Sequence, residues 1–157
     1  MLLRRRGLTG QHYDLVGADG EVADVLLRRL RQGGTVTASD GSGWRVDRAP
    51  GFGAWLTRPI DADGGPPIVT TTKGFSRERY ELEWDGGHLV LVRRRGFHRR
   101  RMELLDGHGA VAGDVGRATV WTGAYDLRLP TYPDAVTATI AFLVVLLNRR
   151  DNSATWS

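Results

Sequence analysis

The chain has 157 residues and no cysteine. Disulfide bonds, thiolate metal sites, thiol catalysis and cysteine lipidation are therefore excluded for these residues, and the absence fits a reducing compartment. Lysine is nearly absent as well: the chain has one lysine, Lys73, and 21 arginines. The net charge of +4 thus resides in guanidinium groups, which suit forked contacts to phosphate or carboxylate. A genome rich in G and C would produce the same scarcity of lysine.

In the N-terminal segment, "MLLRRRGLTG", no apolar run follows the basic residues. It does not have the pattern of a secretory signal peptide, so the expected location is the cytoplasm, with any membrane contact peripheral. Hydrophobic residues make up 41% and charged residues 25% of the chain, which is typical of a soluble globular protein. A chain of this length suits a single domain.

Glycine is abundant and follows a repeat. Asp-Gly pairs stand at residues 19–20, 40–41, 63–64, 85–86 and 106–107, with successive spacings of 21, 23, 22 and 21. Gly-Phe pairs at 51–52, 74–75 and 96–97 lie midway between them. Asp-Gly is a strong signal for a tight hairpin, so each unit of about 22 residues reads as turn, strand, turn, strand. The pattern predicts an antiparallel meander whose alternate turns lie at opposite ends.

The segments between these turns alternate as strands do. In "YELEW", Tyr80, Leu82 and Trp84 fall on one face and the glutamates on the other, and "WRVDR" and "YDLRL" behave alike. One strand per half unit between Leu8 and Leu129 gives roughly ten to twelve strands, a sheet long enough to curl, split or close. A closed barrel of that size needs something to fill its lumen.

The segment "AVTATIAFLVVLL", Ala135–Leu147, can fill that lumen. Its 13 residues would form about 20 Å of helix, short of the roughly 30 Å hydrocarbon core of a membrane. Thr131 as cap, Pro133 in the first turn and Asp134 at the positive dipole end predict where it begins, and Asn148–Arg150 where it closes. A β-strand remains an alternative, because valine, isoleucine and threonine are frequent in it, although length and caps favour a helix.

The predicted fold is therefore mainly β, an antiparallel barrel of about twelve strands enclosing a hydrophobic C-terminal helix at about 133–149. Residues 1–150 are predicted to form this single domain and residues 151–157 a flexible tail. A helix that is apolar all round must be surrounded by apolar partners, which the inner faces of the strands supply.

Several segments resemble a known family. "RRMELLDGHGAVAGDVG" (Arg100–Gly116), the following "ATVWTGAYDL" and the terminal apolar helix are similar to the LURP-one-related proteins of the tubby C-terminal-like superfamily, which also includes the phospholipid scramblases. The resemblance implies a twelve-stranded barrel around a hydrophobic helix. It also implies phosphoinositide binding for the tubby branch and membrane association for the scramblase branch. The chain lacks the proline-rich N-terminal region, cysteine cluster and acidic calcium loop of scramblases, so scrambling and calcium control are not expected.

The strongest polar feature is "RRRGFHRRR", which flanks a predicted turn, and the repeat places Arg48 and Phe52 at the same end of the barrel. Basic residues around exposed aromatics suit anionic lipid headgroups, each cation contributing about 1 kcal/mol. The predicted anion-binding residues are Lys73, Phe75, Arg77, Arg93, Arg94, Arg95, Phe97, Arg99, Arg100 and Arg101. The Asp-Gly turns occupy the opposite end, so the molecule is predicted to be electrically polarised. In the alternative interpretation the phenylalanines fold inward and the arginines are solvated or paired with Glu78, Glu81 and Glu103.

Other functions have weaker signals. A basic patch can also bind nucleic acid, but no recognition motif for it is present. His88 and His108 are expected near Asp85 and Asp106, yet the ligand spacing of a zinc site is absent. No nucleophile elbow or phosphate loop is found either, so no catalytic residue, metal or cofactor is predicted. The predicted function is a monomeric, non-catalytic module that binds anionic phospholipid or phosphoinositide headgroups. The alternative is a protein-interaction scaffold without lipid binding.

Overall fold

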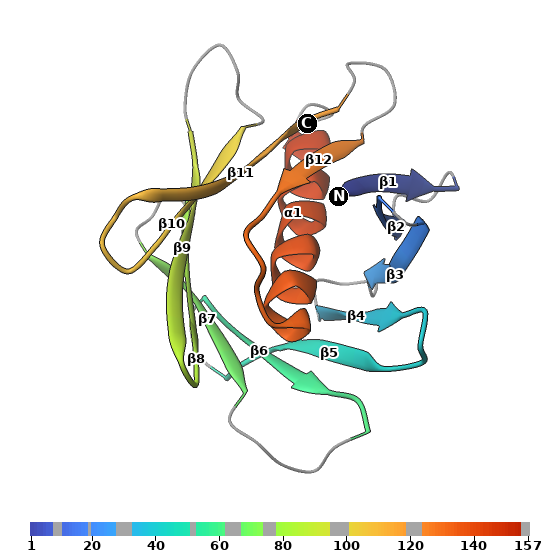
Figure 1. The fold of residues 1–157 in the computed structure, drawn as a ribbon, viewed down its shortest axis with the longest axis horizontal. Coiled ribbons are helices and arrows are strands. Elements are labelled where there is room, and N and C mark those ends of the chain that lie inside the picture. The colour runs from blue at the N-terminus through green and yellow to red at the C-terminus, as the bar shows by residue number, and fades with distance from the viewer. Residues whose placement is uncertain are drawn as a thin grey trace.

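The computed structural model describes residues 1–7, 11–18, 20–27, 33–50, 53–61, 67–73, 78–94, 101–118 and 124–154. These residues form twelve strands and one helix (Figure 1). The elements are β1 (Leu2–Arg6), β2 (His12–Gly17), β3 (Gly20–Leu27), β4 (Gly33–Ala38), β5 (Gly43–Arg48), β6 (Ala54–Pro59), β7 (Ile68–Lys73), β8 (Arg79–Trp84), β9 (Gly87–Arg93), β10 (Met102–Leu105), β11 (Val111–Arg117), β12 (Tyr125–Arg128) and α1 (Asp134–Ala154).

The strands form one closed antiparallel barrel in which each strand pairs with its neighbours in sequence and β12 pairs with β1. The predicted meander of about twelve strands is thus confirmed. Local turn chemistry produces it: Gly41 and Gly86 have φ of +88° and +100°, which glycine adopts without steric cost. At the last Asp-Gly pair the positive φ falls on Gly109 instead, and the Asp106 carboxylate accepts hydrogen bonds from two amides of the turn.

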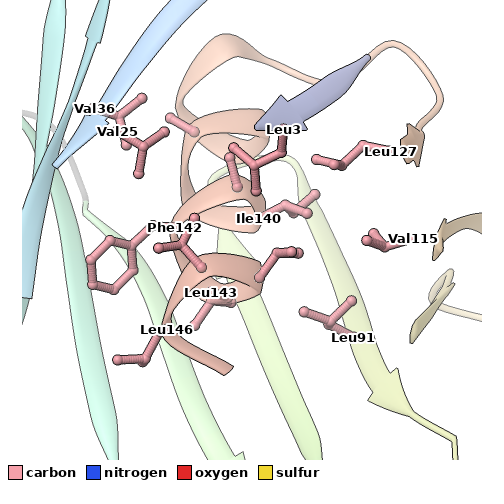
Figure 2. Close-up of a cluster of buried hydrophobic side chains, with 14 of the residues drawn as sticks. Leu3, Val25, Val36, Leu91, Val115, Leu127, Ile140, Phe142, Leu143 and Leu146 are labelled. Carbon is pink, nitrogen blue, oxygen red and sulfur yellow. The ribbon is translucent and has the colours of Figure 1, made fainter. Parts of the chain in front are cut away.

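Helix α1 occupies the middle of the ring of strands in Figure 1. All residues from Ala138 to Asn148 are buried, whichever side of the helix they lie on. Figure 2 shows Ile140, Phe142 and Leu143 of the helix among strand residues such as Val36 and Leu91. The prediction of a helix in the lumen is confirmed and the β-strand alternative is wrong. None of the helices in the described ranges is long and apolar enough to cross a membrane.

The predicted helix ends need correction at both termini. The Pro133 carbonyl accepts hydrogen bonds from the amides of Val136 and Thr137, so Pro133 itself takes the position expected for Thr131. At the other end the helix continues to Ala154, beyond the predicted close at Asn148–Arg150 and into the segment predicted to be a flexible tail. Asn148 does not end the helix; its side chain forms hydrogen bonds with Tyr125 and Tyr13 inside the barrel.

Three polar contacts, made by two residues of the helix, fix it within the barrel. The Asn148 Oδ1 accepts a hydrogen bond from the Tyr125 hydroxyl (2.7 Å), and its Nδ2 donates to the Tyr13 hydroxyl (3.3 Å). Nearer the start of the helix, the hydroxyls of Thr139 and Thr57 lie 2.8 Å apart. Because buried polar groups need partners, these contacts favour one rotation and one depth of α1 over others that would also satisfy its apolar surface.

Candidate functional site

Strand direction separates the charges of the barrel into two groups. In an antiparallel meander the odd-numbered strands all run toward the same end. Five of these six strands finish on a basic residue, and β3 is the exception with Leu27. The five residues are Arg6, Arg48, Lys73, Arg93 and Arg117. Only one of the six strands that run the other way, β12, finishes on a basic residue. We call the end toward which the odd strands run the basic end.

The opposite end, called the acidic end, carries the turns after the even-numbered strands. The described aspartates there are Asp40, Asp61, Asp85 and Asp106, and α1 starts at the same end with Asp134. Hydrogen bonds from the hydroxyl and amide of Ser42 lower the pKa of Asp40, and those from the amides of His108 and Ala110 lower the pKa of Asp106. Both carboxylates are therefore ionised at neutral pH. The predicted polarisation of charge holds for the described residues.

The two ends also suit the helix that joins them. Helix α1 follows β12, so it begins at the acidic end and runs toward the basic end, where Asn148 contacts residues at the start of β2 and β12. Carboxylates near the positive start of a helix dipole and guanidiniums near its negative end are both favourable. The dipole of α1 is thus one structural reason for the charge pattern.

The predicted anion-binding residues fall largely outside the described residues. Phe75, Arg77, Arg95, Phe97, Arg99 and Arg100 are among those not described, as is Phe52. Lys73 is the last residue of β7. Arg93, Arg94 and Arg101 are described, and the ends of β9 and β10 bring these three together, as predicted from the turn between them.

Arg94 and Arg101 are paired with acids. Arg94 donates from Nε and Nη2 to Glu103 Oε2, at 2.7 and 2.6 Å. Arg101 Nη2 lies 3.8 Å from Asp114 Oδ2, a looser pair. Glu103 is one of the three glutamates that the alternative interpretation named as partners of the arginines. The basic charge of β9 and β10 is thus partly neutralised along the strands.

Other cations at the basic end were missed, or received little weight, in the sequence analysis. Arg48 and Arg149 are exposed and form no ion pair within the described residues. Arg149 was assigned to closing the helix, whereas the helix passes through it. A count of strand lengths from each turn would have found Arg48, Arg93 and Arg117 as strand ends. For Arg149 the sequence has no comparable signal, because its place depends on where the helix leaves the barrel.

A separate charged cluster ties β1, β2 and β3 together on the outer face. The Asp14 side chain is only 5% exposed and forms ion pairs with Arg4 (3.5 Å) and Arg6 (3.2 Å). His12 Nε2 lies 2.8 Å from Asp24 Oδ2. In the register of β2 and β3, Asp24 is directly opposite Asp14. The charge of Arg6 is therefore partly neutralised within this cluster, although its side chain is 52% exposed.

His88 and His108 both lie at turns of the acidic end, as predicted, with His88 just after the turn of Asp85 and Gly86 and His108 in the turn of Asp106. His88 lies opposite Glu83 on the β8–β9 hairpin and next to Glu81, with one donor atom from each residue within 4.8 Å of the others. His108 is not part of this group. Glu83 and His88 are exposed, and nothing further in the described part of the chain marks the group as a metal site.

The described residues therefore form a closed barrel with one basic and one acidic end and with its lumen filled by its own helix. Comparisons with protein-family models, with curated proteins and with solved structures found no match.

Proposed function

We propose that the protein is a non-catalytic module that uses its basic end to bind the anionic headgroups of phospholipids at a membrane surface. The observation that carries this proposal is the segregation of charge by strand direction, with five of six strands finishing on a basic residue at one end. Cations collected at one end can face an anionic membrane surface together, so their attractions add.

The chemistry of the basic end supports the same proposal. Arg48 and Arg149 are exposed and without ion pairs within the described residues, so they bring charge that no internal acid neutralises. Each cation near an anionic membrane surface contributes about 1 kcal/mol, and the sum is sensitive to salt. The resemblance to LURP-one-related proteins and their tubby and scramblase relatives also supports a lipid surface as the ligand, by analogy.

The first test compares two double variants of equal charge change. Arg48→Gln with Arg149→Gln removes two cations from the basic end, whereas Arg45→Gln with Arg58→Gln removes two exposed cations that lie opposite each other on β5 and β6, away from the basic end. Co-sedimentation with vesicles of phosphatidylcholine and 30% phosphatidylserine measures partitioning. We expect the first pair to weaken partitioning by about 30-fold, as two contributions of about 1 kcal/mol require, and the second pair to change it less than threefold.

The outcome also decides between the two candidate functions. Equal losses from both pairs would mean that net charge, not the basic end, governs the interaction. No binding of the wild type to anionic vesicles at low salt would refute the lipid proposal and favour a protein-interaction scaffold. Vesicles of phosphatidylcholine alone are the control for attraction that does not depend on charge.

A further inference from the structure

A groove lies on the outer face of the barrel where its first and last strands meet. The β1–β12 pairing has two register pairs, whereas every other pairing of neighbouring strands has at least four. The groove has a volume of about 370 Å³, within the range of small-ligand sites. The residues that line it are Leu2, Asp114, Gly116, Arg117, Ala118, Asp126 and Arg128.

The groove is open over Gly116, which has no side chain to fill it. Leu2, Asp126 and Gly116 lie side by side across β1, β12 and β11, so they form one row on the outer face. A Cβ placed on Gly116 would meet no atom within 4 Å, and this glycine does not have a positive φ. The space is therefore open because Gly116 has no side chain. The backbone conformation at this position does not require glycine.

Two carboxylates flank the open space. Asp126 pairs with Gly116 across the strands, and Asp114 is two residues before Gly116 on β11, which places it on the same face. The one ion pair of Asp114 within the described residues is the loose contact of 3.8 Å to Arg101. An ammonium group seated over Gly116 would have both carboxylates as acceptors.

Guanidinium groups supply the opposite charge within the same lining. Arg128 lies directly across from Asp114, and its Nε is 3.3 Å from Asp126 Oδ2. A guanidinium has five N–H groups, so donors remain for an incoming acidic group. Arg117 also lines the groove, and its buried Nε has no hydrogen-bond partner among the described residues. Arg117 lies opposite the inward-facing Tyr125, so Arg128 is the cation that an acidic group meets on the outer face.

We propose that this seam groove binds a small zwitterion, with its ammonium group between Asp114 and Asp126 and its acidic group on the guanidinium of Arg128. A simple anion would face two carboxylates, and a simple cation would leave the guanidinium unused, so the paired charges select a ligand that carries both. Arg117 belongs to both the groove and the basic end, but the proposed ligand contacts are Asp114, Asp126 and Arg128, so this site does not depend on the function proposed for the basic end.

The test titrates the full chain with β-alanine and follows the backbone amide signals of Gly116 and Ala118 by NMR. Propylamine and propionate have the same number of carbon atoms and carry one charge each. We expect saturable shifts with β-alanine at millimolar concentration, and at least tenfold weaker binding of both other compounds. Equal binding of the three compounds, or no saturable shift with β-alanine, would overturn the proposal.

A matched pair of variants locates the site. Gly116→Leu fills the groove, whereas Gly107→Leu adds the same side chain at another glycine that has open space and no positive φ. We expect at least a tenfold loss of β-alanine binding with the first variant and less than a twofold change with the second. Undiminished binding by a folded Gly116→Leu variant would contradict the assignment. If that variant does not fold, Asp114→Asn keeps the shape of the groove, and binding by it equal to the wild type would contradict the assignment as well.

Discussion

Replacement of Phe142 by aspartate is expected to unfold the whole barrel. The ring of Phe142 is fully buried, and it packs edge-on against Trp55 with the ring centroids 5.8 Å apart. Removing a buried phenylalanine costs about 3–5 kcal/mol, and leaving an unpaired carboxylate in its place adds several more. That sum is comparable with the whole free energy of unfolding of an ordinary domain, about 5–15 kcal/mol. The aspartate variant should lose its near-UV circular dichroism and its cooperative urea transition, and Leu143→Asp should behave in the same way.

Two control variants separate the loss of the core from general effects of substitution. Phe142→Leu keeps an apolar side chain and should fold with a loss of about 1–2 kcal/mol. Val111→Asp introduces the same charge on the outer face, where Val111 is 61% exposed, and should change stability by about 0.5 kcal/mol at most. A Phe142→Asp protein that remained soluble with an unchanged near-UV spectrum would show that the helix is not the core of this domain.

The helix and the barrel could be predicted because both depend on local chemistry. A turn such as Asp85-Gly86 needs only its own residues, and its repetition about every 22 residues sets the strand order. The length of the apolar segment then decided between a membrane span and a buried helix. The end of that helix was beyond such reasoning, because Asn148 is held by Tyr13, 135 residues away in sequence. A residue with such a partner does not act as the stop signal that its type suggests.

The candidate site was predicted less completely for a related reason. The turns indicate which end of the barrel a residue occupies, so the collection of cations at one end could be inferred. Whether a given arginine is neutralised depends on cross-strand register, as for Arg94 and Glu103, and register depends on pairings that a single strand does not specify. The seam groove was missed altogether. It arises from Gly116 lying between Asp126 and the neighbouring strand, and the sequence shows Gly116 only as one of 21 glycines.

Substitution of Gly34 by alanine is expected to destabilise the barrel although it adds a single methyl group. Gly34 lies on the inner face of β4, opposite Val46 of β5. A Cβ there would lie 2.2 Å from the carbonyl oxygen of Leu26 and 2.9 Å from Cε2 of Phe142. The first contact is with the backbone of β3, which is held in the barrel on both sides, so little relaxation is available. We expect a loss of about 3 kcal/mol in the free energy of unfolding, at the upper end for an overpacked core.

A double-mutant cycle shows how much of this loss comes from the helix. Phe142→Leu removes the atom that lies 2.9 Å away but leaves the Leu26 carbonyl in place, so it should relieve part of the cost of Gly34→Ala and not all of it. The matched control is Gly116→Ala, which adds the same methyl group to a strand glycine with no atom within 4 Å, and should be neutral or slightly stabilising. Urea unfolding of the four proteins of the cycle and of the control measures these differences. If the losses from Gly34→Ala and Phe142→Leu are additive, the wall and the helix are not in contact at this position, because two residues that compete for the same space cannot act independently.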